Sequence, residues 1–219
     1  MSVMTTLIGD VIASKSHKHR NALQFSLREV LEFANRTLSP VQPLELSIGD
    51  EFQGAFTDIG AASRATLIIR LGLLVEPERI DTRYGLGEGD VMVFDAARAP
   101  TSQDGPGWWA ARAAIENAKA LEESPRASFA RTCFTTATED AGGQRFEASV
   151  EALLLCRDAL VDRMNARQRR LLLGLMLGQS QGALAIAENV TQSAVSQSLH
   201  RSYAFAVEAA QRRLEKAFL

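Results

Sequence analysis

Two aspartates, Asp10 and Asp50, each follow the dipeptide Ile-Gly at the end of an apolar run. Residues 7–11 are Leu-Ile-Gly-Asp-Val, and residues 47–52 are Ser-Ile-Gly-Asp-Glu-Phe. Carboxylates are the ligands that hard cations prefer, and a neighbouring glycine such as Gly49 lets a backbone or a ligand approach closely. If the two strand ends meet on one sheet, we expect Asp10 and Asp50 to hold Mg²⁺ or Mn²⁺ against a phosphate group.

Each aspartate alone also has a structural interpretation. Asp50 lies in a Gly-Asp turn, where most aspartates are solvated turn residues, and Asp10 could cap the helix that follows it. Glu51 and Glu88 either complete an oxygen shell or remain solvated loop acids. The matched context of the two aspartates favours the metal site.

A basic cluster follows Asp10 and is the candidate phosphate clamp. Arg20 suits a triphosphate best; the alternative is that the cluster is only the solvated start of a helix. Its members are Lys15, His17, Lys18, His19 and Arg20.

The elements that must position these residues follow from periodicity and from the glycines and prolines. A strand is predicted over residues 4–9, a helix over 15–37, and a hairpin with strands 44–48 and 52–56. A helix capped by Asp58 follows to residue 74. A second hairpin is predicted from strands 79–86 and 90–94 around Gly87-Glu88-Gly89, then a loop over 95–107, a helix over 108–122 and a strand over 128–138.

The resulting order, β-α-β-β-α-β-β-α-β, predicts an α+β fold with a ferredoxin-like or palm-type β-α-β-β-α-β core. From residue 146 onward every periodic segment is helical. We therefore expect two domains, the sheet domain at 1–145 and an all-α domain at 146–219.

Four motifs within residues 7–112 resemble those of the class III nucleotide cyclases. They are Leu-Ile-Gly-Asp-Val-Ile-Ala-Ser at 7–14, Ile-Gly-Asp-Glu-Phe-Gln-Gly at 48–54, Arg-Tyr-Gly-Leu-Gly-Glu-Gly-Asp-Val at 83–91 and Gly-Trp-Trp-Ala-Ala-Arg at 107–112. The whole chain resembles the SatD family of bacterial proteins more closely still. The cyclase resemblance implies metal ions on Asp10 and Asp50, with Arg112 stabilising charge on the leaving group. It also implies a homodimer, because in cyclases that arginine comes from the partner subunit.

Two positions depart from the cyclase pattern. Trp108 stands where cyclases have an asparagine that orients the ribose, and Leu46 stands where adenylyl cyclases have a base-selecting lysine. Neither side chain can make those hydrogen bonds. We therefore expect binding of a metal and a nucleotide with little or no turnover. Trp108 and Trp109 either stack a base or anchor their helix to the sheet or to a dimer interface.

The helical tail carries the signature of a helix-turn-helix. Asn165, Ser180 and Thr191 are the predicted N-caps of three successive helices, with a turn at Asn189-Val190. Ala183, Ile186 and Ala187 are expected to pack against Val195 and Leu199. The predicted DNA contacts are Gln192, Ser193, Ser196, Gln197 and Arg201 on the second helix of the pair, and Arg167, Arg169 and Arg170 on the preceding helix. The alternative is a plain three-helix bundle used for dimerisation.

Charge and composition fit this division. Residues 157–219 hold nine Lys and Arg against five Asp and Glu, a net charge of +4 within a chain of −2. No apolar stretch is long enough to cross a bilayer, and neither Cys133 nor Cys156 has a metal-like spacing. We expect a cytoplasmic, homodimeric, DNA-binding transcription regulator whose cyclase-like domain binds a metal and a nucleotide of unspecified identity. The alternatives are an active nucleotide cyclase or other metal-dependent nucleotidyl enzyme, and a non-catalytic assembly protein.

Overall fold

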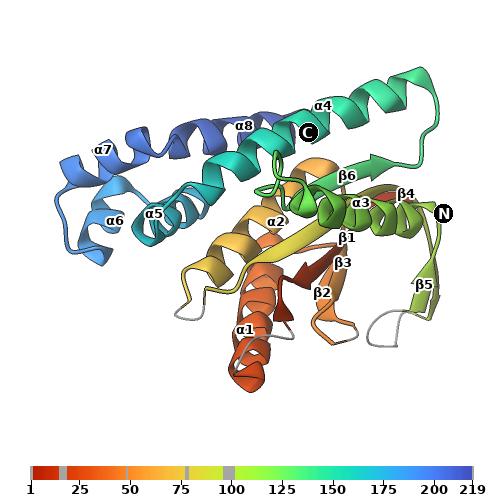
Figure 1. The fold of residues 1–219 in the computed structure, drawn as a ribbon, viewed down its shortest axis with the longest axis horizontal. Coiled ribbons are helices and arrows are strands. Elements are labelled where there is room, and N and C mark those ends of the chain that lie inside the picture. The colour runs from red at the N-terminus through yellow and green to blue at the C-terminus, as the bar shows by residue number, and fades with distance from the viewer. Residues whose placement is uncertain (1, 15–18, 48, 77–78, 96–101, 219) are drawn as a thin grey trace.

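The computed structural model describes residues 2–14, 19–47, 49–76, 79–95 and 102–218. The strands are β1 (Ser2–Val11), β2 (Gln42–Leu46), β3 (Phe52–Phe56), β4 (Thr82–Asp95), β5 (Ser102–Asp104) and β6 (Thr132–Thr136). The helices among them are α1 (Arg20–Leu38), α2 (Ile59–Leu74) and α3 (Pro106–Glu123). Five helices follow: α4 (Ala141–Asp162), α5 (Ala166–Met176), α6 (Gln181–Ala187), α7 (Gln192–Arg201) and α8 (Ala204–Lys216), as Figure 1 shows.

The sheet is built around β1, which pairs antiparallel with β3 on one side and with β4 on the other. β2 pairs antiparallel with β3, so the order β2-β3-β1-β4 is antiparallel throughout. This is the strand arrangement of a β-α-β-β-α-β unit, as predicted. β5 then pairs with the far end of β4, and β6 runs parallel to its first half. The fold is therefore mixed α+β.

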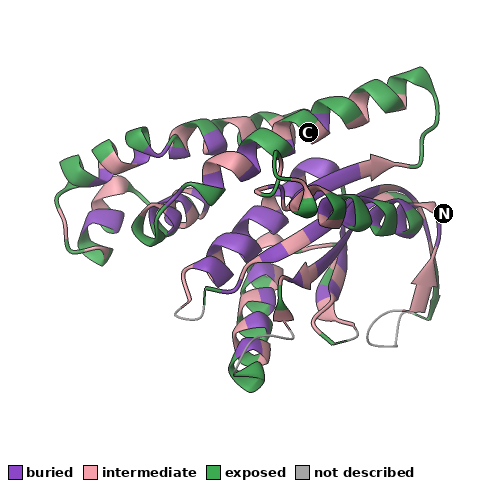
Figure 2. Ribbon diagram, in the orientation of Figure 1, coloured by how far each residue is buried: buried purple, intermediate pink, exposed green. Residues whose placement is uncertain are grey.

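Both faces of the sheet are covered, because side chains alternate between the faces along each strand. Leu7, Phe52 and Tyr84 are buried on the face under α1 and α2. Ile8 is buried on the opposite face, where Trp108 of α3 packs against it. In Figure 2 the central strands and α2 are almost wholly buried, whereas α1 buries only one side.

The predicted second hairpin is wrong: β4 is one continuous strand from Thr82 to Asp95. Gly85, Gly87 and Gly89 are spaced by two, so all three face α3. A Cβ on Gly87 would lie 2.1 Å from the backbone nitrogen of Ala111, and one on Gly85 would lie 2.2 Å from the carbonyl oxygen of Ala111. The glycines therefore let a helix lie directly on the strand, and they do not form a turn.

Most other elements agree with their predicted positions, and the differences are local. Residues 102–104, predicted as loop, form β5, while the strand predicted over 128–138 is shorter. Residues 15–18 of the predicted first helix, Ile48 and residues 96–101 of the predicted loop lie outside the described residues.

Helix α4 covers β6 by supplying acceptors to its backbone. Thr132 N–H donates to Asp158 at 2.7 Å, Thr136 N–H donates to Glu147 at 2.8 Å, and Phe134 N–H donates to Glu151. Three carboxylates on one helix thus satisfy donors that a further strand would otherwise take.

The helices after α4 pack on the side of α2 that faces away from the sheet core. Leu67 and Leu71 of α2 share a core with Leu172 of α5 and with Val195 and Leu199 of α7. The predicted domain boundary at 145/146 falls inside α4, which begins at Ala141, and the division into two domains stays a prediction. None of the helices within the described ranges has the length and hydropathy that a membrane span requires.

Candidate functional site

Asp10 lies at the end of β1, directly opposite Arg83 of β4, on the face covered by α3. Arg83 donates to both oxygens of Asp10, from Nε at 2.9 Å and from Nη2 at 3.3 Å. The ammonium group of Lys119 on α3 lies 3.6 Å from the second oxygen. The Asp10 carboxylate is therefore already bound by two cations of its own chain.

Burial raises the pKa of Asp10, and the hydrogen bond and charge of Arg83 act against that rise. The negative charge of Asp50 adds to the increase, so the two aspartates lie close enough to interact electrostatically. The repeated Ile-Gly-Asp motif thus places its two carboxylates at the same end of the sheet.

A second ion pair crosses the same region. Arg112 of α3 donates to both oxygens of Glu51, in the turn between β2 and β3, at 2.7 and 2.8 Å. This hydrogen bonding raises the pKa of Arg112. The predicted charge stabiliser is therefore held by a carboxylate of its own chain. Arg83 also donates to Glu122 at 2.7 Å, which ties α3 to the beginning of β4.

These residues, as arranged, do not fit a resident metal ion. Within the described ranges no three Asp, Glu, His or Cys side chains gather into a group that could hold one. Asp10 faces Arg83 and Lys119, and Glu51 faces Arg112. A divalent cation would have to displace charges that already neutralise these acids.

The other predicted members of this site lie in different surroundings. Gly49 has a φ of +71°, and its carbonyl accepts a hydrogen bond from Gln24 of α1. Arg20 is exposed at the start of α1. Glu88 alternates with Gly87 and Gly89, so it lies on the opposite face from Asp10, and burial raises its pKa. Glu88 therefore does not complete a shell around Asp10.

The two tryptophans have different roles. Trp108 is buried against Ile8 and Val91, which agrees with the predicted anchor of α3 to the sheet. Trp109 is 60% exposed, and its indole N–H donates to Asp104 of β5 at 2.7 Å.

Hydrogen bonds from side chains fix the beginnings of α5, α6 and α7. Asn165 and Gln168 form a reciprocal capping box at the start of α5. Ser180 accepts from Ala183 N–H and Thr191 accepts from Ala194 N–H, as predicted for the next two helices. The turn between α6 and α7 contains Asn189 with a φ of +52°.

The exposed face of α7 carries Gln192, Ser193, Gln197 and Arg201, while Ser196 is half-buried. Val195 and Leu199 face the core, as predicted. The predicted packing face of α6 is wrong. Leu184 and Ala185 are buried there, whereas Ala183 and Ala187 are exposed and Ile186 is 84% exposed. Leu184 instead faces α5, where its Cδ2 lies against Gly174, a position without a side chain.

The three arginines predicted on α5 have different environments. Arg169 is only 5% exposed and donates to the carbonyl of Asp162, so it is removed from the candidate phosphate contacts. Arg170 donates to both oxygens of Glu188 at 2.6 and 2.7 Å, and Arg167 lies 3.5 Å from the same carboxylate. Glu188 thus ties α5 to the end of α6.

The model of the SatD family matches residues 4–214 of the chain. The chain belongs to the SatD family. A comparison with curated proteins gave no match.

Among solved structures, this SatD-family chain is similar to a bacterial light-regulated adenylyl cyclase, with 19% identity and a TM-score of 0.48. That match covers 66% of this chain but only 44% of the cyclase. Adenylyl cyclase CyaB from P. aeruginosa matches with 16% identity and a TM-score of 0.40, over 51% of this chain and 70% of that one. An adenylate/guanylate cyclase/hydrolase from Silicibacter pomeroyi matches with 20% identity and the same TM-score, over 50% and 66%. Likenesses this distant carry no argument about function.

A buried polar network, absent from the sequence predictions, connects the two parts of this SatD-family chain. Arg157 of α4 donates to the Ser63 carbonyl of α2 at 3.0 Å and to the Thr132 hydroxyl of β6 at 2.7 Å. The Ser63 hydroxyl donates to Gln211 of α8 at 2.8 Å, and Gln211 donates to the Gly60 carbonyl. The signal in the sequence is that Arg157 and Asp158 interrupt the apolar stripe formed by Val150, Leu154 and Val161.

Proposed function

We propose that the chain is a DNA-binding transcription regulator in which α6 and α7 form a helix-turn-helix and α7 enters the major groove. The observation that carries this proposal is the exposed row of Gln192, Ser193, Gln197 and Arg201 on α7. The opposite face of the helix packs through Val195 and Leu199. The protein thus presents polar side chains on a helix whose orientation is fixed by its core.

The chemistry of this row suits the recognition of bases. Glutamine can pair with the N6 and N7 atoms of adenine. Arginine can pair with the O6 and N7 atoms of guanine or with a phosphate, and serine with either a base or a phosphate. The N-caps at Ser180 and Thr191 set where each helix begins, so the row keeps a defined register relative to the groove.

The experiment is a selection of bound fragments from genomic DNA, followed by fluorescence anisotropy on the selected duplex and on a scrambled duplex. Gln197→Ala should reduce the preference for the selected duplex by about 1–3 kcal/mol, the usual range for one base contact. Gln144→Ala, on the exposed surface of α4, is the matched control and should leave the preference unchanged. If the protein binds no fragment even at low salt, α5–α7 are a plain helical bundle and the proposal fails.

A second candidate function is the binding of a nucleotide phosphate at the end of β1 and β4. Arg83, Lys119 and Arg112 support it, since three cations lie around Asp10 and Glu51. Gly49 and Arg20 stay as predicted contacts. A nucleotide would have to take the place of a carboxylate, for example Glu51 on Arg112. Binding of each nucleoside triphosphate, measured by calorimetry with Mn²⁺ and without metal, tests this candidate.

The same samples separate binding from catalysis. With little or no turnover, the triphosphate remains intact after incubation with Mg²⁺ or Mn²⁺. Formation of a cyclic or linear nucleotide product that is lost in Asp50→Asn would establish the enzyme alternative instead.

A regulator of this kind requires that the ligand favour one arrangement of the helices over another, because equal affinity for two arrangements shifts nothing. The network of Arg157, Ser63 and Gln211 is the connection through which the sheet domain and the α8 helix would be coupled. We propose that the acting unit is a homodimer, which analytical ultracentrifugation of the intact chain tests.

A further inference from the structure

A pocket beside α7 is lined by two cations, Arg163 and Arg201. Its volume is about 350 Å³, which is ample for a phosphate group. The end of α4, the first turn of α5 and the joint between α7 and α8 surround it. Its polar lining consists of Arg163, Gln168, Arg201, Ser202 and Tyr203.

The charge of this pocket is not neutralised. Arg163 and Arg201 are exposed, and neither guanidinium forms an ion pair or a hydrogen bond with any residue in the described ranges. No carboxylate belongs to the lining. On α5, by contrast, Arg167 and Arg170 are held by Glu188. The free cations near α7 thus face the same hollow.

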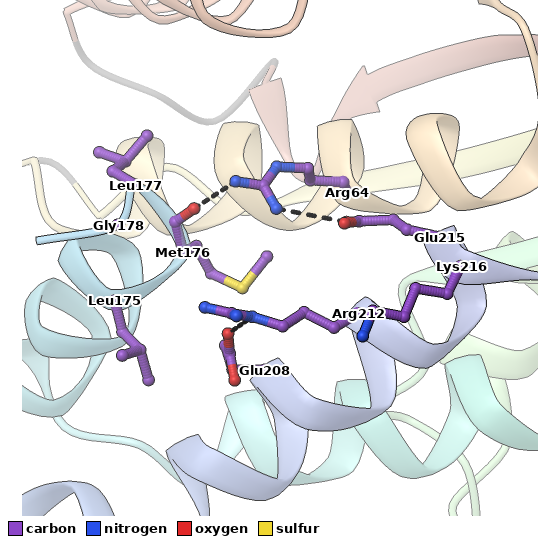
Figure 3. A pocket seen from close by; sticks show the side chains of 9 residues that line it. All are labelled: Arg64, Leu175, Met176, Leu177, Gly178, Glu208, Arg212, Glu215 and Lys216. Carbon is purple, nitrogen blue, oxygen red and sulfur yellow. Dashed lines mark hydrogen bonds and ion pairs between the residues drawn. The ribbon is translucent and has the colours of Figure 1, made fainter. Parts of the chain in front are cut away.

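The pocket drawn in Figure 3 shows what a neutralised site looks like. It lies between α2, α5 and α8, has a volume of about 380 Å³ and contains three cations, one more than the pocket beside α7. There, however, Arg64 pairs with Glu215 at 3.3 Å and Arg212 pairs with Glu208. An anion entering that pocket would have to displace two carboxylates, which is not required in the pocket beside α7.

The first turn of α5 adds donors to the pocket beside α7. In the capping box, the Gln168 side-chain oxygen accepts from Asn165 N–H at 2.9 Å. The amide nitrogen of Gln168 is then left to donate. The N-terminus of this 11-residue helix also carries a partial positive charge, which favours an anion over a cation. Two arginines and one side-chain amide therefore surround one cavity, beside the first turn of α5.

We propose that this pocket binds a phosphate group, and that the phosphate belongs to the DNA backbone beside the groove that α7 enters. Arg201 follows Gln197 by four residues, so it lies one helical turn further along the same exposed row. A phosphate next to the recognised bases is thus within reach of the pocket. This inference rests on the proposed DNA-binding function and adds Arg163, Gln168 and Tyr203 to the contacts.

The test is the salt dependence of DNA binding by the full chain and by Arg163→Gln. Loss of one phosphate contact should reduce the slope of log K against log[salt] by about 0.9 and weaken the selected and scrambled duplexes about equally. Arg213→Gln is the matched control, because Arg213 is an exposed cation on α8 outside the pocket. The inference fails if Arg163→Gln retains the wild-type slope, or if Arg213→Gln loses as much.

A second arm separates DNA from free phosphate as the source. Inorganic phosphate is titrated into the protein without DNA at constant ionic strength, and binding is followed by calorimetry. Millimolar or tighter binding that disappears in Arg163→Gln would assign the pocket to a small phosphate ligand and overturn the DNA source. If the wild-type protein binds no DNA, the proposed function fails independently. In that case, binding of inorganic phosphate that is lost in Arg163→Gln would show that the pocket is an anion site, and no binding would show that it is not.

Discussion

Asp10 and Arg83 are direct partners across β1 and β4, and the Arg83 guanidinium donates to both oxygens of the Asp10 carboxylate. A sequence motif that resembles a metal-binding strand therefore ends in an internal ion pair. Lys119 adds a second cation to the same carboxylate. The ion pair changes what the motif can do, because the charge that a metal would supply is already present.

Replacing Arg83 with glutamine should destabilise the protein by about 1–3 kcal/mol at pH 7, because a largely buried carboxylate loses its partner. The loss should be smaller at pH 4. Burial already raises the pKa of Asp10 above 3.8, and Arg83 opposes that rise, so the variant raises it further. When the pKa of a carboxyl is higher in the folded state than in the unfolded state, the folded state binds the proton more tightly. The free energy of unfolding then falls as the pH rises from the unfolded-state pKa through the folded-state pKa. Urea denaturation at both pH values measures the effect.

Arg36→Gln is the control for this experiment, since Arg36 pairs with Glu32 on the exposed surface of α1. Its effect should stay within about 0.5 kcal/mol at either pH. An equal loss for Arg83→Gln at pH 7 and at pH 4 would show that the ion pair does not control the titration of Asp10.

Gly87→Ala should cost more than about 3 kcal/mol or prevent folding, because the added Cβ would meet the backbone of α3, which cannot move as a side chain can. Gly182→Ala is the matched control. Its Cβ would meet only the Ser180 hydroxyl at 3.8 Å, and alanine is the better helix former by up to about 1 kcal/mol. Thermal unfolding of the two variants would contradict this account if both lost similar stability.

The same glycines show where sequence reasoning succeeds and where it stops. The order of strands and helices could be predicted, because periodicity and helix caps are local signals; Asp58, Asn165, Ser180 and Thr191 cap the predicted helices. The division of residues 79–94 into strands could not be predicted, because β4 is one continuous strand and not a hairpin. A glycine in a turn and a glycine under a helix look alike in sequence, and only the packing of α3 distinguishes them.

The candidate site was predictable to a similar extent. The repeated motif placed Asp10 and Asp50 at one end of the sheet, but it did not reveal that Arg83 and Lys119 face Asp10. Those contacts join segments more than 70 residues apart, and no local pattern encodes them. Four of the five residues predicted to face outward on α7 are exposed and Ser196 is half-buried, because Val195 and Leu199 define the buried face. The burial of Arg169 was not predicted, because burial of an arginine depends on the helices around it.

Arg157→Met should destabilise the protein by about 3–5 kcal/mol, the range for removing one partner of a buried charged network. The change leaves Asp158 without one of its cations and removes the hydrogen bond to the Thr132 hydroxyl. The Ser63 carbonyl loses one of its two side-chain donors and keeps Thr66. Chemical denaturation measures the loss. Arg213→Met, an exposed position on α8, should change stability by no more than about 0.5 kcal/mol. A loss below about 1 kcal/mol for Arg157→Met would mean that the network does not hold the two parts together.

Glu188→Gln should strengthen DNA binding, because it releases Arg170 and Arg167 from the carboxylate that holds them. If both arginines then reach phosphates, the slope of log K against log[salt] becomes steeper by about 1.8. The hydrogen bond from Arg170 lowers the pKa of Glu188 below 4.5. The Arg170–Glu188 pair therefore stabilises the fold above about pH 4.5, and this stabilisation is lost as the pH falls through the pKa of Glu188 in the folded state. The Glu188→Gln variant should lack this pH dependence.

Glu215→Gln is the matched control, because it removes a carboxylate from the pair that Arg64 of α2 forms with α8, which involves neither α5 nor α7. Fluorescence anisotropy over a salt series should distinguish the two variants. If Glu188→Gln binds DNA no more tightly than the wild type, the exposed side of α5 does not face the backbone. The contacts would then be confined to α7 and the pocket around Arg163. If Glu215→Gln strengthens binding equally, the gain reflects net charge and not the position of Arg170.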